Sequence, residues 1–480
     1  MKAFLRKIKP LVFLLDIAAG FMIIPLGFAA LLGDAVMVRA FALPLGGELL
    51  AALPVHLAVR NRKAAFAQAD GFFLVFAAWL LCALLGAFPY WLSGSGLSFT
   101  DSVFESACGF ATTGATTVAD VEALPRPLLL WRSMSHWLGG LGIVVLTIAL
   151  FPLLGMGGFQ LAKAEAPGAE RQNPRLSSSA KFLWLAYSIL TALLFLLYRL
   201  GGMSGFDALC HALPVMASGG VSTRNAGMAF FDSPFIDGVS VVFMLLAGLN
   251  FNLYLKIGGG KFREALSNTE ARAYLLIFAL AALILGCSLV PVYGSLGQAL
   301  RYGSYQAASV LSTTGSVIAD YGLWPPLAQA VILALMFIGG CSGSTAGGIK
   351  VIRHVLLWKQ AGNEIRRSLF PRGVFALRLN GKPARRDLVH GAAGFVCLYA
   401  LTVIAAALVS AAAGLDMLSA GSIALAMTGN TGMGFGAAGP GQNFGAFPDF
   451  LKWFYSFVMI AGRLELWTAL VMLSPAYWRR

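Results

Sequence analysis

The chain has 480 residues, of which 58% are hydrophobic and only 12% are charged. Because a soluble domain carries about 25% charged residues, this composition excludes a soluble globule and indicates a polytopic membrane protein. The formal net charge of +14 would also suit a nucleic-acid-binding protein. However, the basic residues stand in clusters between hydrophobic stretches, as membrane topology requires, so we expect membrane lipid and no nucleic acid as partner.

Ten hydrophobic stretches are candidates to cross a bilayer, for which a helix needs about 20 apolar residues. The first follows a basic N-terminus, but its apolar run of about 23 residues is too long for a signal peptide. We therefore expect an all-α polytopic membrane protein with about ten transmembrane helices, at residues 10–32, 37–58, 71–92, 127–156, 180–201, 234–256, 272–293, 324–358, 386–413 and 446–474.

Shorter glycine-rich apolar segments lie between some of these spans, at 100–118, 206–222, 298–318 and 416–436. With roughly 12 helical residues each they suit re-entrant half-helices, which are tolerated where protein or water surrounds them. The order span, re-entrant helix, span thus occurs four times from residue 70 onward. The predicted organisation is an N-terminal two-helix extension (1–69) followed by pore repeats at 70–179, 180–271, 272–385 and 386–480.

The basic residues orient this topology. With a cytoplasmic N-terminus, 27 of the 35 Lys and Arg lie on the inner side and six lie outside or near outer span ends. Lys452 and Arg463 fall within the last span. This asymmetry requires the short segments to return to the side from which they came, and it places both termini in the cytoplasm.

The tips of the four short segments read "ATTGAT", "ASGGVS", "STTGSV" and "GNTGMG". Helix-start signals precede them at Thr100-Asp101, Ser204 with Asp207, Gly294-Ser295 and Asp416. A half-helix that enters from outside directs its partly negative C-terminal end toward the membrane centre, which favours a cation. Glycine permits the left-handed dihedrals that aim carbonyl groups inward.

Four such tips around one axis could form carbonyl rings that replace the hydration shell of a monovalent cation. The alternative is that these small residues only allow close helix packing, which is less consistent with four tips at similar spacing. The predicted filter and potassium ligands are Thr112, Thr113, Gly114, Ser218, Gly219, Gly220, Thr313, Thr314, Gly315, Asn430, Thr431 and Gly432.

The span 324–358 is too long for a simple crossing and has five glycines between Gly339 and Gly348. Each glycine costs a helix up to about 1 kcal/mol relative to alanine, so we expect an irregular mid-membrane loop, a candidate gate under the filter. "CSGSTAGGIK" resembles a P-loop, but Ile349 separates the glycines from the lysine and no strand precedes them. Helix packing through small residues is the other alternative.

Arg463 is an intramembrane charge and therefore a functional candidate. We expect it to face the cavity below the filter, where it would repel cations or pair with carbonyls of the glycine-rich loop; snorkelling to an interface is the alternative. Lys350 and Arg353 could also be interfacial anchors, and Glu465 needs a partner that the sequence does not identify. The predicted gate residues are Gly339, Gly340, Gly343, Ser344, Thr345, Gly347, Gly348, Lys350 and Arg463.

The whole chain resembles the Trk/Ktr/HKT superfamily of potassium transporters, and most closely its bacterial TrkH type. The motifs that carry the resemblance are "CGFATTGATT", "GGVSTRNAG", "LSTTGS", "GGCSGSTAGGIKVIR" and "AGRLELWT". It implies K+ as the transported ion, a homodimer in the bacterial inner membrane, and a cytosolic, nucleotide-binding, TrkA-like regulatory ring. Ser218 and Val221 depart from the family's frequent Thr and Phe, and the fourth tip is looser.

A sodium-permeable or proton-coupled symporter on the same scaffold is the alternative function. In the plant branch of the family a serine at the first filter position accompanies sodium, so Gly114 favours potassium. Walker motifs are not evident, and no cytosolic segment is long enough for a soluble catalytic domain, so we do not expect an enzyme or an organic cofactor. Six scattered cysteines without a CxxC pair favour neither a metal site nor a disulfide framework.

Overall fold

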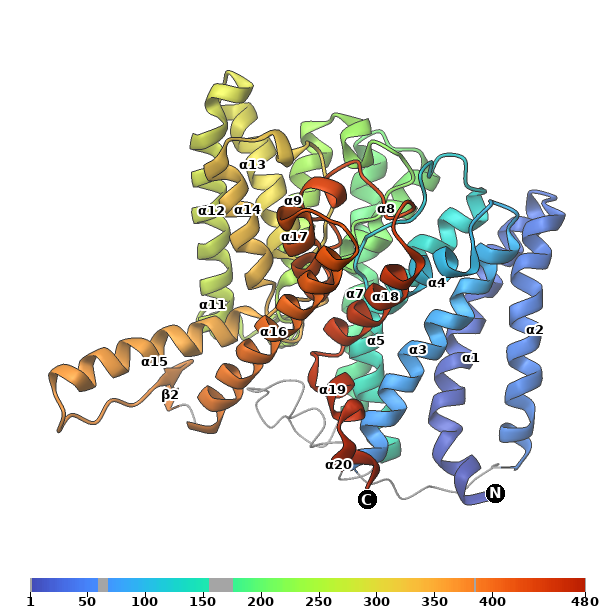
Figure 1. Cartoon of the computed structure of the whole chain (residues 1–480), viewed down its shortest axis with the longest axis horizontal. Helices are drawn as coiled ribbons and strands as arrows, with labels where there is room; N and C mark the ends of the chain where they lie inside the picture. Colours follow the sequence, from blue (N-terminus) through green and yellow to red (C-terminus); the bar gives the residue numbers. More distant parts are fainter. Residues whose placement is uncertain (1, 59–67, 155–175, 384–385, 480) are drawn as a thin grey trace.

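The computed structural model describes residues 2–58, 68–154, 176–383 and 386–479 (Figure 1). Within these ranges the chain is almost entirely helical, and the one sheet found there is an antiparallel pair, β1 (Arg378–Leu379) and β2 (Lys382–Pro383). Eight basic residues on which the predicted orientation partly depends lie outside the described residues: Arg60, Arg62, Lys63, Lys163, Arg171, Arg175, Arg385 and Arg480.

Six helices in the described part of the chain are long and apolar enough to cross a membrane without interruption. They are α1 (Lys2–Leu31), α2 (Ala35–Ala58), α3 (Gln68–Leu92), α7 (Leu176–Leu200), α12 (Thr269–Tyr293) and α16 (Arg386–Ala412). The span expected at 127–156 corresponds to the 29-residue helix α5 (Arg126–Leu154).

The other three expected spans are each divided into two helices. Residues 324–358 form α14 (Pro326–Ile338) and α15 (Val351–Leu369), separated by the predicted break. The spans 234–256 and 446–474 were expected to be continuous, but they form α9 (Pro234–Gly248) with α10 (Asn252–Gly258), bent by 99°, and α18 (Asp449–Arg463) with α19 (Trp467–Leu473). At the last break Glu465 and Leu466 have φ values of +56° and +55°, which an α-helix cannot contain.

The four predicted re-entrant helices are α4 (Phe99–Phe110), α8 (Gly205–Met216), α13 (Leu296–Leu311) and α17 (Met417–Thr428). Side chains of Ser98, Ser204, Ser295 and Asp416 cap their N-termini. The first helix begins before the predicted Thr100-Asp101 signal, because Ser98 Oγ accepts from the Asp101 backbone N–H and donates to its carboxylate. The remaining short elements are α11 (Phe262–Leu266), α20 (Pro475–Trp478), η2 (Gly227–Phe231), η3 (Tyr321–Leu323) and η4 (Gly436–Ala438).

The four span–re-entrant helix–span repeats form a closed ring. The helix that follows each tip packs against the re-entrant helix of the next repeat: α5 on α8, α9 on α13, α14 on α17 and α18 on α4. The last of these contacts joins the fourth repeat to the first. Helices α1 and α2 pack outside the ring against α3 and α5, at the right edge of Figure 1, while α15 projects at the lower left.

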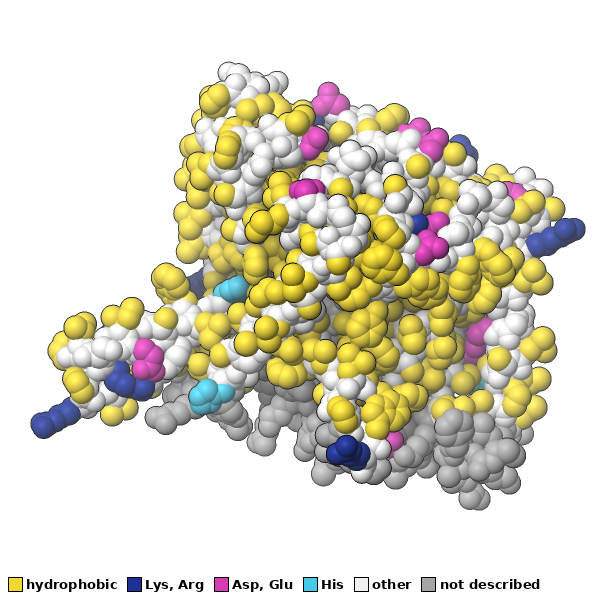
Figure 2. All heavy atoms as spheres, in the orientation of Figure 1, with side chains coloured by type: hydrophobic (Ala, Val, Ile, Leu, Met, Phe, Trp, Pro, Cys, Tyr) yellow, Lys and Arg dark blue, Asp and Glu magenta, His cyan; other side chains and the backbone are white. Residues whose placement is uncertain are grey.

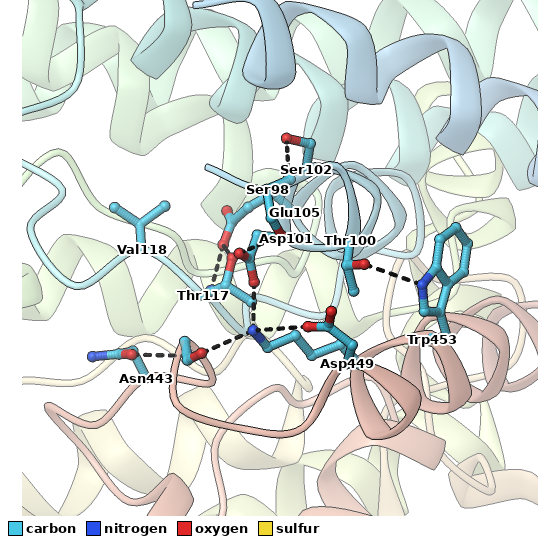
Figure 3. Close-up of polar contacts among 12 residues, drawn as sticks. Ser98, Thr100, Asp101, Ser102, Glu105, Thr117, Val118, Asn443, Asp449 and Trp453 are labelled. Carbon is cyan, nitrogen blue, oxygen red and sulfur yellow. Dashed lines mark hydrogen bonds and ion pairs between the residues drawn. The ribbon is translucent and has the colours of Figure 1, made fainter. Parts of the chain in front are cut away.

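Ion pairs support two of these contacts; the re-entrant helix supplies the acidic partner in one pair and the basic partner in the other. Lys452 of α18 binds Asp101 of α4 at 2.7 Å, and Asp237 of α9 binds Arg301 of α13 at 2.6 Å. Lys452 also donates to the carbonyl of Gly445 at 2.8 Å. The neighbouring Trp453 ring nitrogen donates to Thr100 at 3.2 Å (Figure 3). These pairs hold separate repeats together near the start of the re-entrant helices.

The surface has the character that the composition predicts. Hydrophobic side chains cover much of the face shown in Figure 2, and acidic side chains gather toward its upper loops. Many large apolar side chains on the crossing helices are exposed, among them Leu50 on α2, Leu196 on α7 and Leu276 on α12. Such a belt requires lipid around it rather than water.

We expect Lys452→Met to destabilise the folded protein, because it leaves the Asp101 carboxylate without its positively charged partner in a largely buried contact. Removing one partner of a buried ion pair costs on the order of 3–5 kcal/mol; the two side chains are 5% and 18% exposed. Thermal unfolding of the purified protein in detergent measures the effect. The double variant Lys452→Met/Asp101→Asn should regain much of the loss, and Lys261→Met at an exposed site serves as control. Equal destabilisation of the single and double variants would contradict this account.

Candidate cation site

All four re-entrant helices end in the same hydrogen-bonded turn. In the first repeat the N–H of Thr112 donates to the carbonyl of Gly109 and the N–H of Thr113 donates to that of Cys108, which is a Schellman motif. The equivalent pairs of bonds occur after α8, α13 and α17. The chain therefore reverses in the same way at each helix C-terminus, whose partial negative charge favours a cation.

The left-handed residue of each turn is not a glycine. Thr112, Ser218, Thr313 and Asn430 have φ values of +53°, +57°, +55° and +57°. This conformation costs a side-chain-bearing residue roughly 1–2 kcal/mol, so other contacts must stabilise it. Two residues later, Gly114, Gly220, Gly315 and Gly432 also have positive φ, between +49° and +84°.

These four glycines lie in a cyclic arrangement against backbone carbonyls. A Cβ added to Gly114 would stand 2.6 Å from the carbonyl oxygen of Gly219, and one added to Gly432 would stand 2.0 Å from that of Thr113. The corresponding distances are 2.1 Å from Gly220 to Thr314 and 2.1 Å from Gly315 to Thr431. Each tip thus contacts the next, and the fourth contacts the first.

The carbonyl groups that precede the tip glycines belong to Thr113, Gly219, Thr314 and Thr431. They come together from four separate repeats, with no room for a side chain at any of the glycines. A ring of carbonyl oxygens supplied by four loops is the arrangement that replaces the water around a monovalent cation in potassium filters.

The threonine hydroxyls differ from one tip to another. Asn430 donates to Thr113 Oγ1 at 3.0 Å, Gly347 N–H donates to Thr313 Oγ1 at 2.7 Å, and Thr314 Oγ1 lies 2.7 Å from Ser312 Oγ. By contrast, the hydroxyls of Thr112 and Thr431 are buried and have no hydrogen-bond partner in the described protein.

The break between α14 and α15, residues 339–350, is called here the inner loop. It lies directly against the left-handed residues of the tips: Ser218 Oγ is 2.8 Å from Thr345 Oγ1, and Thr313 accepts from the Gly347 backbone. Gly347 also packs so closely on Asn430 that a Cβ there would approach its side chain to 3.0 Å. Three of the four tips therefore rest on the inner loop.

The inner loop satisfies its backbone through the break between α9 and α10. The N–H of Cys341 donates to Gly248 at 2.8 Å, and the N–H of Phe251 donates to Gly343 at 3.0 Å. The buried carboxylate of Glu270 accepts from the N–H groups of Ser342 and Ile352 at 2.6 and 3.2 Å. Irregular backbone inside a membrane requires partners of this kind.

Arg463 extends from the end of α18 to the inner loop. Its guanidinium donates to the carbonyl oxygens of Thr345 at 2.5 Å and Gly139 at 3.0 Å, and its side chain is buried. Lys350 donates to the carbonyl of Ala346 within the loop. Two positively charged side chains, one within the loop and one bound to it, thus lie under the tips.

The partner that Glu465 needs is Arg353. The two side chains form an ion pair, and the Arg353 guanidinium also lies 3.7 Å from the centre of the Phe395 ring. Arg353 is buried, whereas an interfacial anchor would reach solvent. The sequence showed both charges, but no spacing rule connects residues 112 positions apart.

The outer loops of the first two repeats are also joined. The Asn225 side chain donates to Asp120 at 2.8 Å and accepts from the Val121 N–H at 2.8 Å. The first of these bonds holds the pKa of the exposed Asp120 carboxyl below its usual value. These contacts join the outer rims of the first two tips.

The fold and the tips define a polytopic membrane protein with four inward-dipping helices around one axis. Residues 49–480 match the TrkH family model, described as "Cation transport protein". The chain belongs to this family, whose members are transporters rather than enzymes.

Two curated relatives illustrate the similarity. The chain is 36% identical over 470 residues to the Trk system potassium uptake protein TrkH of Escherichia coli K12, and 34% identical over 466 residues to that of Halomonas elongata. Each match covers 96% of both chains. The crystal structure of the potassium transporter TrkH from Vibrio parahaemolyticus matches with a TM-score of 0.89 at 33% identity, covering 99% of this chain and 100% of that chain.

We expect Gly432→Ala to reduce K+ flux by at least about tenfold, equivalent to about 1.4 kcal/mol at the site, because its methyl group would clash with the Thr113 carbonyl. Isotope uptake by cells with matched amounts of protein measures this. Gly441→Ala is the matched control: its φ of +78° is close to the +81° of Gly432, but a Cβ there meets nothing within 4 Å. Equal flux in the two variants would contradict the ring geometry.

Proposed function

We propose that this potassium uptake transporter of the Trk family selects K+ with the twelve tip residues at 112–114, 218–220, 313–315 and 430–432. The observation that carries the proposal is the cyclic contact of each tip glycine with the carbonyl of the next repeat. K+ is the substrate; the carbonyl ring of Thr113, Gly219, Thr314 and Thr431 would coordinate it, and the unpartnered hydroxyls of Thr112 and Thr431 would be additional ligands. The division into an extension at 1–69 and four pore repeats is part of this proposal.

The inner loop acts as the gate of this pathway. It lies under the tips, hydrogen-bonds Ser218 and Thr313, and its glycines at 339, 343 and 348 have positive φ. Arg463 and Lys350 add positive charge at the same level, which opposes the passage of a cation in a medium of low dielectric constant. Opening would then require the loop and the Arg463 guanidinium to move away from the tips.

The partners follow from the resemblance and the shape of the inner end. A second copy of the chain would complete a homodimer, and a TrkA-like nucleotide-binding ring would contact the cytosolic end. Helix α15, which has basic residues in its last turn, and the β1–β2 hairpin project there (Figure 1). Helix α1 begins and α20 ends at this same edge, which supports cytoplasmic termini in a bacterial inner membrane.

Growth of a bacterium that lacks its own potassium uptake systems tests this function. Expression of the chain should restore growth in low potassium. Purified protein in proteoliposomes should carry labelled K+ or Rb+ when no nucleotide is supplied for hydrolysis. A proton- or sodium-coupled symporter would show uptake that depends on the corresponding gradient. Failure of both growth and flux with the protein present in the membrane would overturn the proposal.

We expect Arg463→Gln to increase K+ flux several-fold in proteoliposomes, because it removes a buried charge and weakens the hold on Thr345. Deletion of residues 343–348 should act in the same direction. Arg199→Gln, which removes an arginine that donates to the carbonyl of Met203 away from the inner loop, is the matched control. Unchanged or lower flux in a well-folded Arg463→Gln protein would show that this residue is not a barrier.

A further inference from the structure

The four re-entrant helices differ at one equivalent position, nine residues before each tip glycine. Glu105, His211, Gln306 and Ile423 stand there, and all four side chains are buried. Two residues after the tip glycines, on the outer side, the chain has Thr116, Ser222, Val317 and Gly434. At these two positions the first two repeats therefore pair a polar helix residue with a hydroxyl group, whereas the third and fourth repeats have Val317 and Gly434 in place of the hydroxyl.

In the first repeat Glu105 binds the non-helical segment that follows the tip. Its Oε1 accepts from the Thr116 hydroxyl at 2.7 Å, the Thr117 N–H at 2.6 Å and the Thr117 hydroxyl at 3.2 Å. Glu105 and Thr117 point toward each other in Figure 3. A carboxylate that accepts this many bonds fixes the backbone just outside the carbonyl ring.

In the second repeat His211 takes the place of Glu105. Its Nδ1 lies 2.7 Å from the Asp207 carbonyl and must carry the proton, so in the neutral ring Nε2 accepts from the Ser222 hydroxyl at 2.8 Å. The Ser222 hydroxyl oxygen in turn accepts from the Arg224 N–H at 3.0 Å. In the third repeat Gln306 Oε1 is buried with no partner in the described protein, and the neutral Tyr305 hydroxyl instead lies 2.6 Å from Ser316 Oγ after the tip.

Arg132 on α5 connects the two segments that follow the first and second tips. Its Nε donates to Glu105 Oε2 at 3.1 Å and its Nη1 donates to the Ser222 carbonyl at 3.0 Å. The side chain is 4% exposed, so water does not replace either bond readily. One guanidinium thus spans the outer ends of the first and second tips.

We infer that Glu105, Arg132, Ser222 and His211 form a positioning network that sets the spacing of the first two tips and so contributes to discrimination among monovalent cations. The inference rests on the proposed function of the tips as the filter. Selectivity would then be set unequally around the ring, with two tips held by charge-assisted bonds and two held by apolar packing and neutral bonds such as Ser309 Oγ to the Ser316 carbonyl at 2.6 Å.

Arg132→Lys tests the bridge without removing the charge. Lysine can still pair with Glu105 as a point charge, but it lacks the planar fork that reaches Ser222 at the same time. We expect the Rb+/K+ and Na+/K+ uptake ratios of proteoliposomes to change by about three- to tenfold, the factor that one net hydrogen bond provides, while total K+ uptake falls much less. Arg126→Lys, at the exposed start of the same helix, is the matched control and should leave both ratios unchanged.

Ser222→Ala provides an independent variant. It removes the hydroxyl that donates to His211 but keeps the backbone carbonyl that accepts from Arg132. We expect a shift in the same ratios that is less than additive with Arg132→Lys. A loss of uptake that is equal for all cations, or unchanged ratios in both variants, would overturn the inference and leave a structural role only. If Arg132→Lys does not accumulate, Ser222→Ala decides alone; absence of K+ uptake by the unmodified protein would overturn the proposed function instead.

Discussion

The close approach of each tip glycine to the carbonyl of the next repeat is the constraint on which the rest of the structure depends. A Cβ at any of the four glycines would stand between 2.0 and 2.6 Å from that oxygen, so the repeats can meet only where a side chain is absent. The Schellman turns then orient the four tips alike. Helix packing between neighbouring repeats and the ion pairs of Asp101 and Asp237 hold the ring at this distance.

The second requirement is that irregular backbone within a membrane must find partners in the protein. Three interruptions meet it together: the inner loop bonds the α9–α10 break through Gly248 and Phe251, and Arg463 at the end of α18 bonds the loop. Each interruption supplies the donors or acceptors that another lacks. This mutual dependence explains how an irregular loop can lie against the tips, and displacement of the loop would require these helix ends to move with it.

The main features of the fold and of the tips could be predicted from the sequence because they repeat. Four short apolar segments with aligned glycines indicated the ring, and five glycines in an over-long span indicated the inner loop. Other features depend on tertiary contacts that no local pattern encodes. At the break in the span expected at 234–256, Gly248 accepts from Cys341 of the inner loop. The left-handed Ser218, Thr313 and Asn430 bond residues far along the chain, Thr345, Gly347 and Met459. The pairing of Glu465 with Arg353 was hidden for the same reason.

Cation selection is thus proposed to be a property of one carbonyl ring assembled from four repeats. An experimental structure of the protein in Rb+ or Tl+, with anomalous scattering used to locate the ion, tests this most directly. We predict a peak on the central axis, coordinated by the carbonyl oxygens of Thr113, Gly219, Thr314 and Thr431. An ion bound away from these oxygens, or tips separated so that the four carbonyls do not face one axis, would contradict it.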